Sequence, residues 1–346
     1  MSNRLSNFLI PAIAVILGLL AGAIVMLISG YNPIAGYGAL IEGAVGDSYY
    51  LGETLRQMTP YIFAGLAVAF AFRTGLFNIG VEGQLLVGWI AAVWVGISFE
   101  LPKIIHLPLA IIAAGIAGAI WGFVPGFLKA RLRVHEVIVT IMMNYIALHV
   151  TNYFTRHVLS DHRDSTPRVN ETASLASPYF EQITEYSTLH YGVFIALFSA
   201  LVMWFIVEKT KTGFELRSVG LNQHASEYAG MNVNRNIIAS MMISGAFAGL
   251  AGAMEGLGTF GNAFIHTAFS GVGFDGIAVA LLGSNTAIGV VLSAFLFGGL
   301  KVGALKMPIA NVPEELVEIV IAFIIFFVAS SYFIKWVIAR FKRSVK

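Results

Sequence analysis

The chain of 346 residues contains no cysteine, so disulfides, thiolate metal sites and catalysis by a cysteine nucleophile are excluded. Charged residues are also scarce: Asp, Glu, Lys and Arg together make up 12% of the chain, about half the share that is usual in soluble domains. Apolar residues make up 57%. The net charge of +2 is too small to indicate nucleic acid as a partner. The composition therefore predicts a protein whose main solvent is the lipid bilayer.

Motifs that carry catalysis or bind metals are missing as well. The eight histidines are scattered, with no H-x-x-x-H pair, and there is no nucleophile elbow and no carboxylate pair beside a histidine. We therefore expect neither an enzyme active site nor a metal site nor a bound cofactor in this chain. The P-loop pattern G-x-x-x-x-G-K-[ST] is also absent, so any use of ATP requires another subunit.

Long apolar runs predict an all-α integral membrane protein with about ten transmembrane helices in a single domain, residues 1–346. A spanning helix needs about 20 apolar residues, and fewer where protein or water covers one end. Six runs are clear and four are shorter or broken by glycine. The clear runs are 8–29, 107–128, 137–154, 191–207, 237–258 and 316–338, and the others are 59–72, 84–99, 269–283 and 287–305. Within 237–258, Gly245, Gly249 and Gly252 predict a face that packs closely against another helix.

Basic residues predict the orientation of these spans. They gather after the fourth, the sixth and the tenth run, and cytoplasmic loops carry an excess of Lys and Arg. With a cytoplasmic N-terminus, the C-terminus and segment 208–235 are cytoplasmic too, and the hydrophilic segment 155–190 is an extracytoplasmic loop. The basic residues are Lys129, Arg131, Arg133, Lys209, Lys211, Arg217, Arg235, Arg340, Lys342, Arg343 and Lys346.

A polar stretch at 74–84 interrupts the apolar pattern between the second and third runs. Asn78, Glu82 and Gln84 lie among glycines there, and such groups cannot face lipid without a cost of a few kcal/mol or more. We expect a broken or re-entrant segment inside the protein, with Glu82 paired to Arg73 or accepting backbone N–H groups. Structural bracing and lining of a solute path both stay open as roles.

Segment 208–235 is polar and basic at both ends, unlike the apolar runs that flank it. Asn222 is a favourable N-cap and Gly230 a favourable residue just after a helix, so about eight residues between them can form a short helix. Gly220 is expected to break the chain before that helix, and Ala225 gives it a smooth face. The alternative is a solvated loop with one helical turn.

This segment resembles the cytoplasmic motif of permease subunits of ABC importers of the ribose, nucleoside and branched-chain amino-acid type. The matching residues are Gly213, Arg217, Gly220, Asn222, Ala225 and Gly230. Ser218 and Ser226 depart from it, because the family usually has alanine at both places. The runs 75–84, 137–145 and 273–283 look like signatures of the nucleoside or simple-sugar branch.

The resemblance implies that the short helix is a coupling helix that docks on an ATP-binding subunit, which binds ATP and Mg²⁺. It also implies a second related permease, an extracytoplasmic solute-binding protein and a place in the bacterial cytoplasmic membrane. For the solute path it favours a set of buried polar and aromatic side chains. These are Phe70, Asn78, Glu82, Gln84, Asn144, Phe260 and Asp275.

We expect the solute to be a nucleoside, with a simple sugar or an amino acid as the alternative within the same family. A different class of protein also stays open at this point. An ion-coupled secondary transporter would use an intramembrane carboxylate, and Glu82, Glu255 and Asp275 are the candidates.

Overall fold

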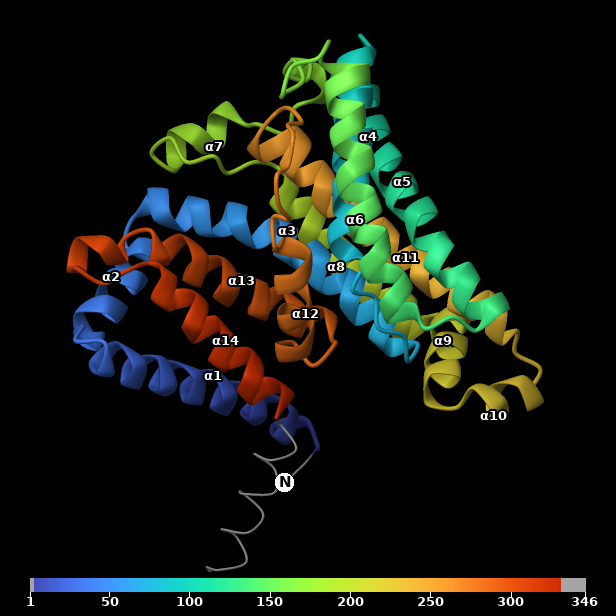
Figure 1. Cartoon of the computed structure of the whole chain (residues 1–346), viewed down its shortest axis with the longest axis horizontal. Helices are drawn as coiled ribbons and strands as arrows, with labels where there is room; N and C mark the ends of the chain where they lie inside the picture. Colours follow the sequence, from blue (N-terminus) through green and yellow to red (C-terminus); the bar gives the residue numbers. More distant parts are fainter. Residues whose placement is uncertain (1–2, 331–346) are drawn as a thin grey trace, which may run out of the picture.

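The structure, a computed structural model, describes residues 3–330 and is helical in this range, with no strand (Figure 1). The four basic residues near the end of the chain, Arg340 to Lys346, lie outside the described residues, as does the last part of the predicted span 316–338. The α-helices are α1 (Asn3–Ile28), α2 (Pro33–Val45), α3 (Ser48–Arg73), α4 (Val81–Ser98), α5 (Lys103–Leu132), α6 (Glu136–Phe154), α7 (Pro178–Ile183), α8 (Gly192–Lys209), α9 (Lys211–Leu221), α10 (Gln223–Tyr228), α11 (Val233–Met254), α12 (Val272–Leu282), α13 (Ala287–Ala304) and α14 (Glu315–Ala329). Short π-helical turns, Thr155–Leu159 and Glu255–Thr259, continue α6 and α11.

Eight of these helices are long and apolar enough to cross a membrane, namely α1, α3, α4, α5, α6, α8, α11 and α13. Each covers one of the ten predicted runs. The other two runs correspond to α12, which has only 11 residues, and to α14, of which 15 residues are described. The prediction of an all-α, multi-pass membrane protein is confirmed, and eight of the ten predicted spans have the length and composition of a crossing.

The structure extends the second predicted run and adds a helix that the sequence did not indicate. Helix α3 begins at Ser48 rather than at residue 59. Glu53 and Arg56 mask this beginning in a hydropathy profile, but they form an ion pair of 2.8 Å, and Glu53 also accepts the Thr188 N–H and O–H. Helix α2 precedes it, capped by Asn32. Paired charges can therefore be accommodated in an otherwise apolar helix.

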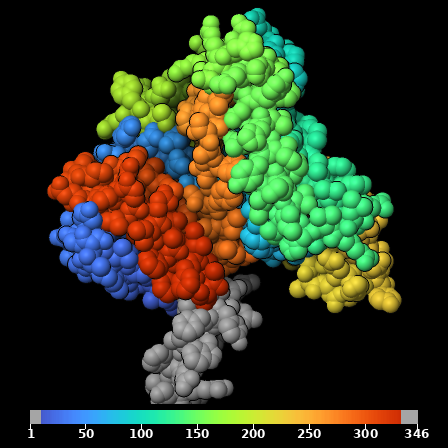
Figure 2. All heavy atoms as spheres, viewed as in Figure 1, coloured from blue at the N-terminus to red at the C-terminus, as the bar shows by residue number. Residues whose placement is uncertain are grey.

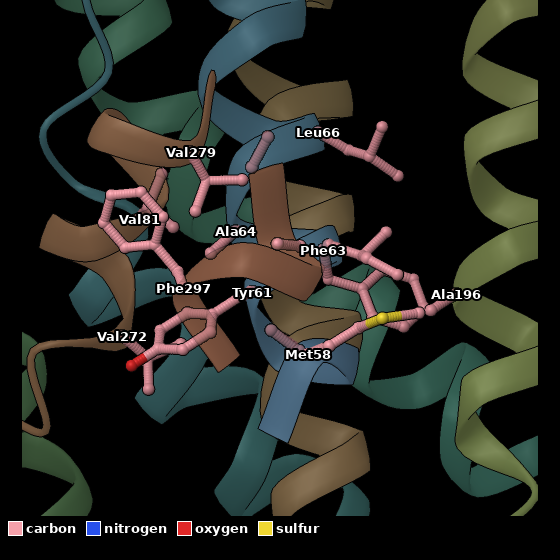
Figure 3. Close-up of a cluster of buried hydrophobic side chains, with 14 of the residues drawn as sticks. Met58, Tyr61, Phe63, Ala64, Leu66, Val81, Ala196, Val272, Val279 and Phe297 are labelled. Carbon is pink, nitrogen blue, oxygen red and sulfur yellow. The ribbon is translucent and has the colours of Figure 1, made fainter. Parts of the chain in front are cut away.

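Helix α3 is the centre of the bundle, because every residue from Met58 to Ala71 is buried. In Figure 3, Phe63 points towards Ala196 of α8, and Ala64 lies beside Val279 of α12. Phe297 of α13 is also fully buried in this cluster. Helices α8, α11, α12 and α13 all pack around α3. An apolar helix covered on all sides is the expected core of a membrane bundle.

Glycines bring α4, α5 and α11 into backbone contact. A Cβ atom at Gly118 of α5 would overlap the carbonyl oxygen of Gly245, and one at Gly252 of α11 would overlap that of Leu85. A Cβ at Gly249 would overlap the Ala114 carbonyl oxygen of α5, and one at Gly88 of α4 would overlap the Gly249 backbone. The predicted close-packing face of Gly245, Gly249 and Gly252 is thus confirmed. Small residues permit this approach, which maximises dispersion contacts where lipid gives no hydrophobic driving force.

Two polar assemblies occupy opposite ends of the bundle (Figure 1). At one end, segment 155–190 contains α7 and is hydrogen-bonded to the chain after α11. The Val169 N–H donates to the Gly261 carbonyl, and the Thr166 N–H donates to the Ala263 carbonyl. At the other end, α9 and α10 lie near the end of α5. Segment 155–190 is therefore a folded cap, and segment 208–235 lies at the far end from it.

We predict that Gly118→Ala destabilises the protein while Gly115→Ala, on the same helix, does not. The added Cβ at Gly118 meets the Gly245 backbone, whereas the nearest atom at Gly115 is a Leu250 methyl carbon at 3.6 Å. Overpacking of this kind costs about 1–3 kcal/mol. Thermal unfolding of the two variants in detergent checks the difference, and equal melting temperatures would contradict the close α5–α11 packing.

Candidate functional site

Helices α4 and α12 both begin inside the bundle rather than at its ends. The non-helical residues 74–80 precede α4, and the irregular segment 260–271 precedes α12. Helix α12 ends level with the end of α3, because Arg73 Nε donates to the Asn285 carbonyl at 3.1 Å. Near the start of α12, Gly276 packs against Ala64, about the middle of α3. Helix α12 thus runs over only half of the bundle. Such discontinuous helices are typical of solute sites in transporters.

Glu82 joins the two helix beginnings. It lies in the first turn of α4 and is completely buried. Its Oε1 accepts the Gly271 N–H at 3.0 Å and the Ser270 hydroxyl at 2.6 Å, and its Oε2 accepts the Gly273 N–H at 2.6 Å. Of the two predicted arrangements, the one with backbone N–H groups is confirmed, and the pairing with Arg73 is wrong. A carboxylate is favoured here because the N-terminal ends of both helices carry partial positive charge.

Asn78 and Gln84 form a second buried group in the same break. The Asn78 amide donates to Gln84 Oε1 and to Ser244 Oγ, each at 2.8 Å, and its oxygen accepts the Gly80 N–H. Ser244 in turn donates to the Ala67 carbonyl of α3. This group ties α3, α4 and α11 together. Sequence reasoning missed Ser244, because a serine among small residues of an apolar helix gives no separate signal.

Asn144 braces the break from α6. Its oxygen accepts the Gly83 N–H at 2.8 Å and its amide donates to the Ile79 carbonyl at 2.9 Å. The side chain is 1% exposed. Asn144 therefore satisfies one donor and one acceptor that the broken backbone leaves open. Asn144 thus ties α6 to the break.

Asp275 belongs to a separate charged group on three helices. Its carboxylate accepts the Tyr61 hydroxyl at 3.1 Å and lies 3.4 Å from Lys301 Nζ of α13. Lys301 also contacts Glu318 of α14 at 2.5 Å. The prediction included only Asp275, although a lone lysine in the apolar run 287–305 was a signal for the rest. In the described part of the chain, no group of three or more His, Asp and Glu residues could hold a metal ion.

The two predicted aromatic residues lie in different surroundings. Phe70 is 1% exposed and packs against Phe247 of α11 inside the core. Phe260 is 45% exposed and stacks on Trp89 with ring centres 5.3 Å apart. Phe264 packs edge-on against the same indole. Phe260 thus belongs to an aromatic cluster that is open on one side, whereas Phe70 has no exposed surface to offer.

Helix α10 has the caps that the sequence predicted. The Asn222 side chain accepts the Ala225 N–H at 3.0 Å. At the other end Gly230 has a φ of +83°, and the N–H groups of Gly230 and Met231 donate to the Glu227 and Ser226 carbonyls. This pattern is the Schellman arrangement that glycine permits. The helix itself has six residues, and Ala225 on it is exposed.

The residues before α10 form a helix of their own, so the expected chain break at Gly220 is wrong. Gly213 and Gly220 both lie within α9. A Cβ at Gly213 would overlap the backbone of α8, and one at Gly220 would lie 2.6 Å from the Arg73 carbonyl oxygen. Gly75, with a φ of +70°, faces Gly220 across this contact. Gly220 is therefore required for close approach, not for a turn.

Arg217 connects α9 to the end of α3 through one carboxylate. Arg217 donates to Glu208 Oε2 at 2.8 Å, and Arg73 donates to Glu208 Oε1 at 3.1 Å. Arg73 also bonds the α12–α13 turn at Asn285. Glu208 was not among the predicted site residues, because only the fold brings it between two arginines. Segment 208–235 is thereby bonded to the end of α3, just before the first break, and through Arg73 to the turn after α12.

We predict that Asn144→Leu lowers the free energy of unfolding by about 1–3 kcal/mol, because a buried N–H and a buried carbonyl lose their partner. Thr140→Val is the matched control on α6. The Thr140 hydroxyl donates only to carbonyls of its own helix, so its loss is expected to have little effect. Thermal unfolding of both variants makes the measurement, and an unchanged Asn144→Leu protein would refute the bracing role.

Comparisons with known proteins find similar permeases over nearly the whole length of this chain. Residues 50–329 match a family described as branched-chain amino acid transport system / permease component. The guanosine ABC transporter permease protein NupP of Bacillus subtilis (strain 168) is 67% identical over 99% of both chains. The nucleoside ABC transporter permease protein NupB of Lactococcus lactis subsp. cremoris (strain MG1363) is 42% identical over 99% of this chain and 96% of its own.

A third relative has a different solute in its name. The glucose ABC transporter permease protein TsgB13 of Haloferax volcanii is 34% identical over 94% of this chain and 88% of its own. No solved structure matches this chain. The family match, the full-length relatives and the apolar helices lead to one conclusion. The chain belongs to the family of branched-chain amino acid transport system permease components, and it is a multi-pass ABC transporter permease of the plasma membrane rather than an enzyme.

Proposed function

We propose that this chain is a membrane subunit of an ATP-driven importer of nucleosides. The observation that carries the proposal is the full-length similarity to two permeases whose names specify guanosine and nucleosides. The runs 75–84, 137–145 and 273–283 support the same branch. A simple sugar is the second candidate solute, because a glucose permease is also similar over most of the chain.

The proposal includes an orientation and ten crossings. Segment 208–235 and both termini face the cytoplasm, and the cap of residues 155–190 faces outside. The basic residues Lys129, Arg131 and Arg133 support this orientation, because they line one cavity together with His224 of α10. Segment 260–271 and the half-length α12 together complete one crossing, and α14 makes the last one.

The proposed partners follow from the family. ATP-binding subunits bind ATP and Mg²⁺ and dock on α10 and the end of α9, where Tyr228 is 95% exposed and Leu221 is 88% exposed. A second, related permease completes the membrane part, because the family is described as one component of a transport system. A solute-binding protein delivers the solute to the cap of residues 155–190.

The contacts of α9 support a physical route for coupling. A push on α10 is transmitted to α9, which has no room to slide, because Gly220 is in backbone contact with the turn at Arg73 and Gly75. That turn leads directly into the break before α4. The same motion reaches α12 through the Arg73 bond to Asn285. In this proposal the two breaks lie beside the solute path, and the polar side chains that hold them must shift together. These side chains are Asn78, Glu82, Gln84 and Asn144. Phe260 and Asp275 reach its surface, and Phe70 supports it from the core.

We predict that the whole importer, reconstituted in liposomes, takes up radiolabelled guanosine when ATP is supplied. Without ATP, an imposed H⁺ or Na⁺ gradient is expected to drive no uptake, because this chain is powered by its partner subunits. Uptake driven by the gradient alone would favour an ion-coupled carrier instead, with Glu82, Glu255 or Asp275 as the coupled carboxylate. Guanosine uptake is also measured with unlabelled glucose as a competitor. Reduced guanosine uptake would favour the sugar as a solute, and unchanged uptake would favour the nucleoside.

We predict that Gly220→Ala uncouples the importer. The added methyl group lies 2.6 Å from the Arg73 carbonyl oxygen, so α9 must move away from the break. ATP-dependent uptake is expected to fall severalfold while the ATPase rate persists. Gly38→Ala is the control, because a Cβ at Gly38 meets no atom within 4 Å. Full uptake by the Gly220→Ala importer would argue against coupling through this contact.

A further inference from the structure

Three charged side chains remain partly exposed on one face of the bundle. Lys301 is 27% exposed and Asp275 18%, and they lie 3.4 Å apart. Glu318, at 2.5 Å from Lys301, is 61% exposed. These three residues, with the Tyr61 hydroxyl on Asp275, are called the charged group below. It carries a net charge of −1, and its most exposed member is an acceptor.

The charged group reaches the middle of the bundle. Tyr61 is the fourteenth of the 26 residues of α3, and its hydroxyl donates to Asp275. Asp275 itself lies in the first turn of α12, which begins half-way along α3. A charged side chain at this depth costs several kcal/mol in contact with lipid. Asp275 must therefore face water, solute or another protein, and Lys301 and Glu318 extend the group to the last turn of α13 and the first turn of α14.

A row of aromatic rings borders the same face from the other side. Phe274, next to Asp275 on α12, is 40% exposed. Its ring centre lies 5.8 Å from that of Phe269, which lies 5.1 Å from that of Tyr145 on α6. Tyr145 is 52% exposed. Tyr145, Phe269 and Phe274 are called the aromatic row below.

The face lies in a recognisable place on the molecule. In Figure 2, the orange atoms of the segment before α12 and of α12 itself are visible between the green atoms of α6 and the red atoms of α13 and α14. The aromatic row comes from the α6 side of this strip and the charged group from the α13–α14 side. Polar and aromatic groups thus converge on the exposed side of a half-length helix.

We propose that this face is the wall of the solute path, where the charged group bonds the ribose hydroxyls and the aromatic row stacks on the base. The assignment rests on the proposed function and adds the solute contacts to it. A nucleoside consists of a ribose with hydroxyl groups and an aromatic base, and the face offers partners for both parts. Carboxylates accept hydrogen bonds from vicinal hydroxyls and an ammonium donates to them, and aromatic rings stack on a base without regard to its identity. A simple sugar would use only the charged group.

The absence of cysteine makes a direct test possible. Single-cysteine variants Glu318→Cys and Phe274→Cys are made in the whole importer, with Ile120→Cys of α5 as the control. Ile120 is 59% exposed and lies in an apolar stretch, so it faces lipid. Membrane vesicles are treated on both sides with a charged, membrane-impermeant thiosulfonate. The rate of modification is measured with and without guanosine while ATP is hydrolysed.

Cysteines at 318 and 274 are expected to react, because water fills the path, and guanosine is expected to slow both reactions at least severalfold. The cysteine at 120 is expected to stay unmodified. If neither 318 nor 274 reacts, or if guanosine leaves both rates unchanged, the face is not the solute path. Guanosine uptake by the wild-type importer is measured in the same vesicles. Its absence would refute the proposed function itself, which separates the two failures.

A second readout concerns the base alone. Phe274→Leu removes the ring but keeps an apolar side chain, and it should raise KM for guanosine uptake about fivefold or more, as loss of one stacking partner does. Phe274→Tyr keeps the ring and should restore the wild-type KM. Equal KM values for the leucine and tyrosine variants would overturn the stacking role, because a purely structural role would not depend on the ring.

Discussion

The carboxylate of Glu82 is the interaction on which the rest of this structure depends. It is fully buried in an apolar bundle, where an unpartnered charge would not be tolerated. The Gly271 and Gly273 N–H groups and the Ser270 hydroxyl surround it instead. These bonds hold the beginnings of α4 and α12 together inside the membrane. Two helices can therefore start inside the bundle, and the half-length helix α12 presents Phe274 and Asp275 on a partly exposed face.

The structure also needs a firm connection between the break held by Glu82 and the end of the bundle where α9 lies. Backbone contacts and the salt bridges of one carboxylate form this connection. Gly220 allows α9 to touch the turn after α3, and Glu208 holds Arg73 and Arg217 at once. Arg73 reaches the α12–α13 turn as well. Helix α9 is therefore connected to the turn before α4 and, through Arg73, to the end of α12. A permease whose energy comes from another subunit requires such a connection.

Much of this arrangement could be predicted from the sequence. The apolar runs predicted the membrane class and eight of the crossings, and Asn222 with Gly230 predicted α10, because capping is a local property of a few residues. The start of α3 was missed because Glu53 and Arg56 neutralise each other only when folded. Gly220 was misread as a break, since a glycine needed for close approach looks the same in sequence as one needed for a turn.

The candidate site, like the fold, could be predicted from the sequence only in part. The sequence by itself determined which polar residues must be buried, because Asn78, Glu82, Gln84 and Asn144 lie among apolar residues that exclude water. Only the tertiary structure decided their partners. Glu82 bonds residues almost 200 positions away, and Asp275 meets Lys301 and Glu318 on separate helices. The local sequence shows that each buried polar group needs a hydrogen-bonding partner. Which residue becomes that partner depends on which side chains lie close in space, and the packing of the helices decides this.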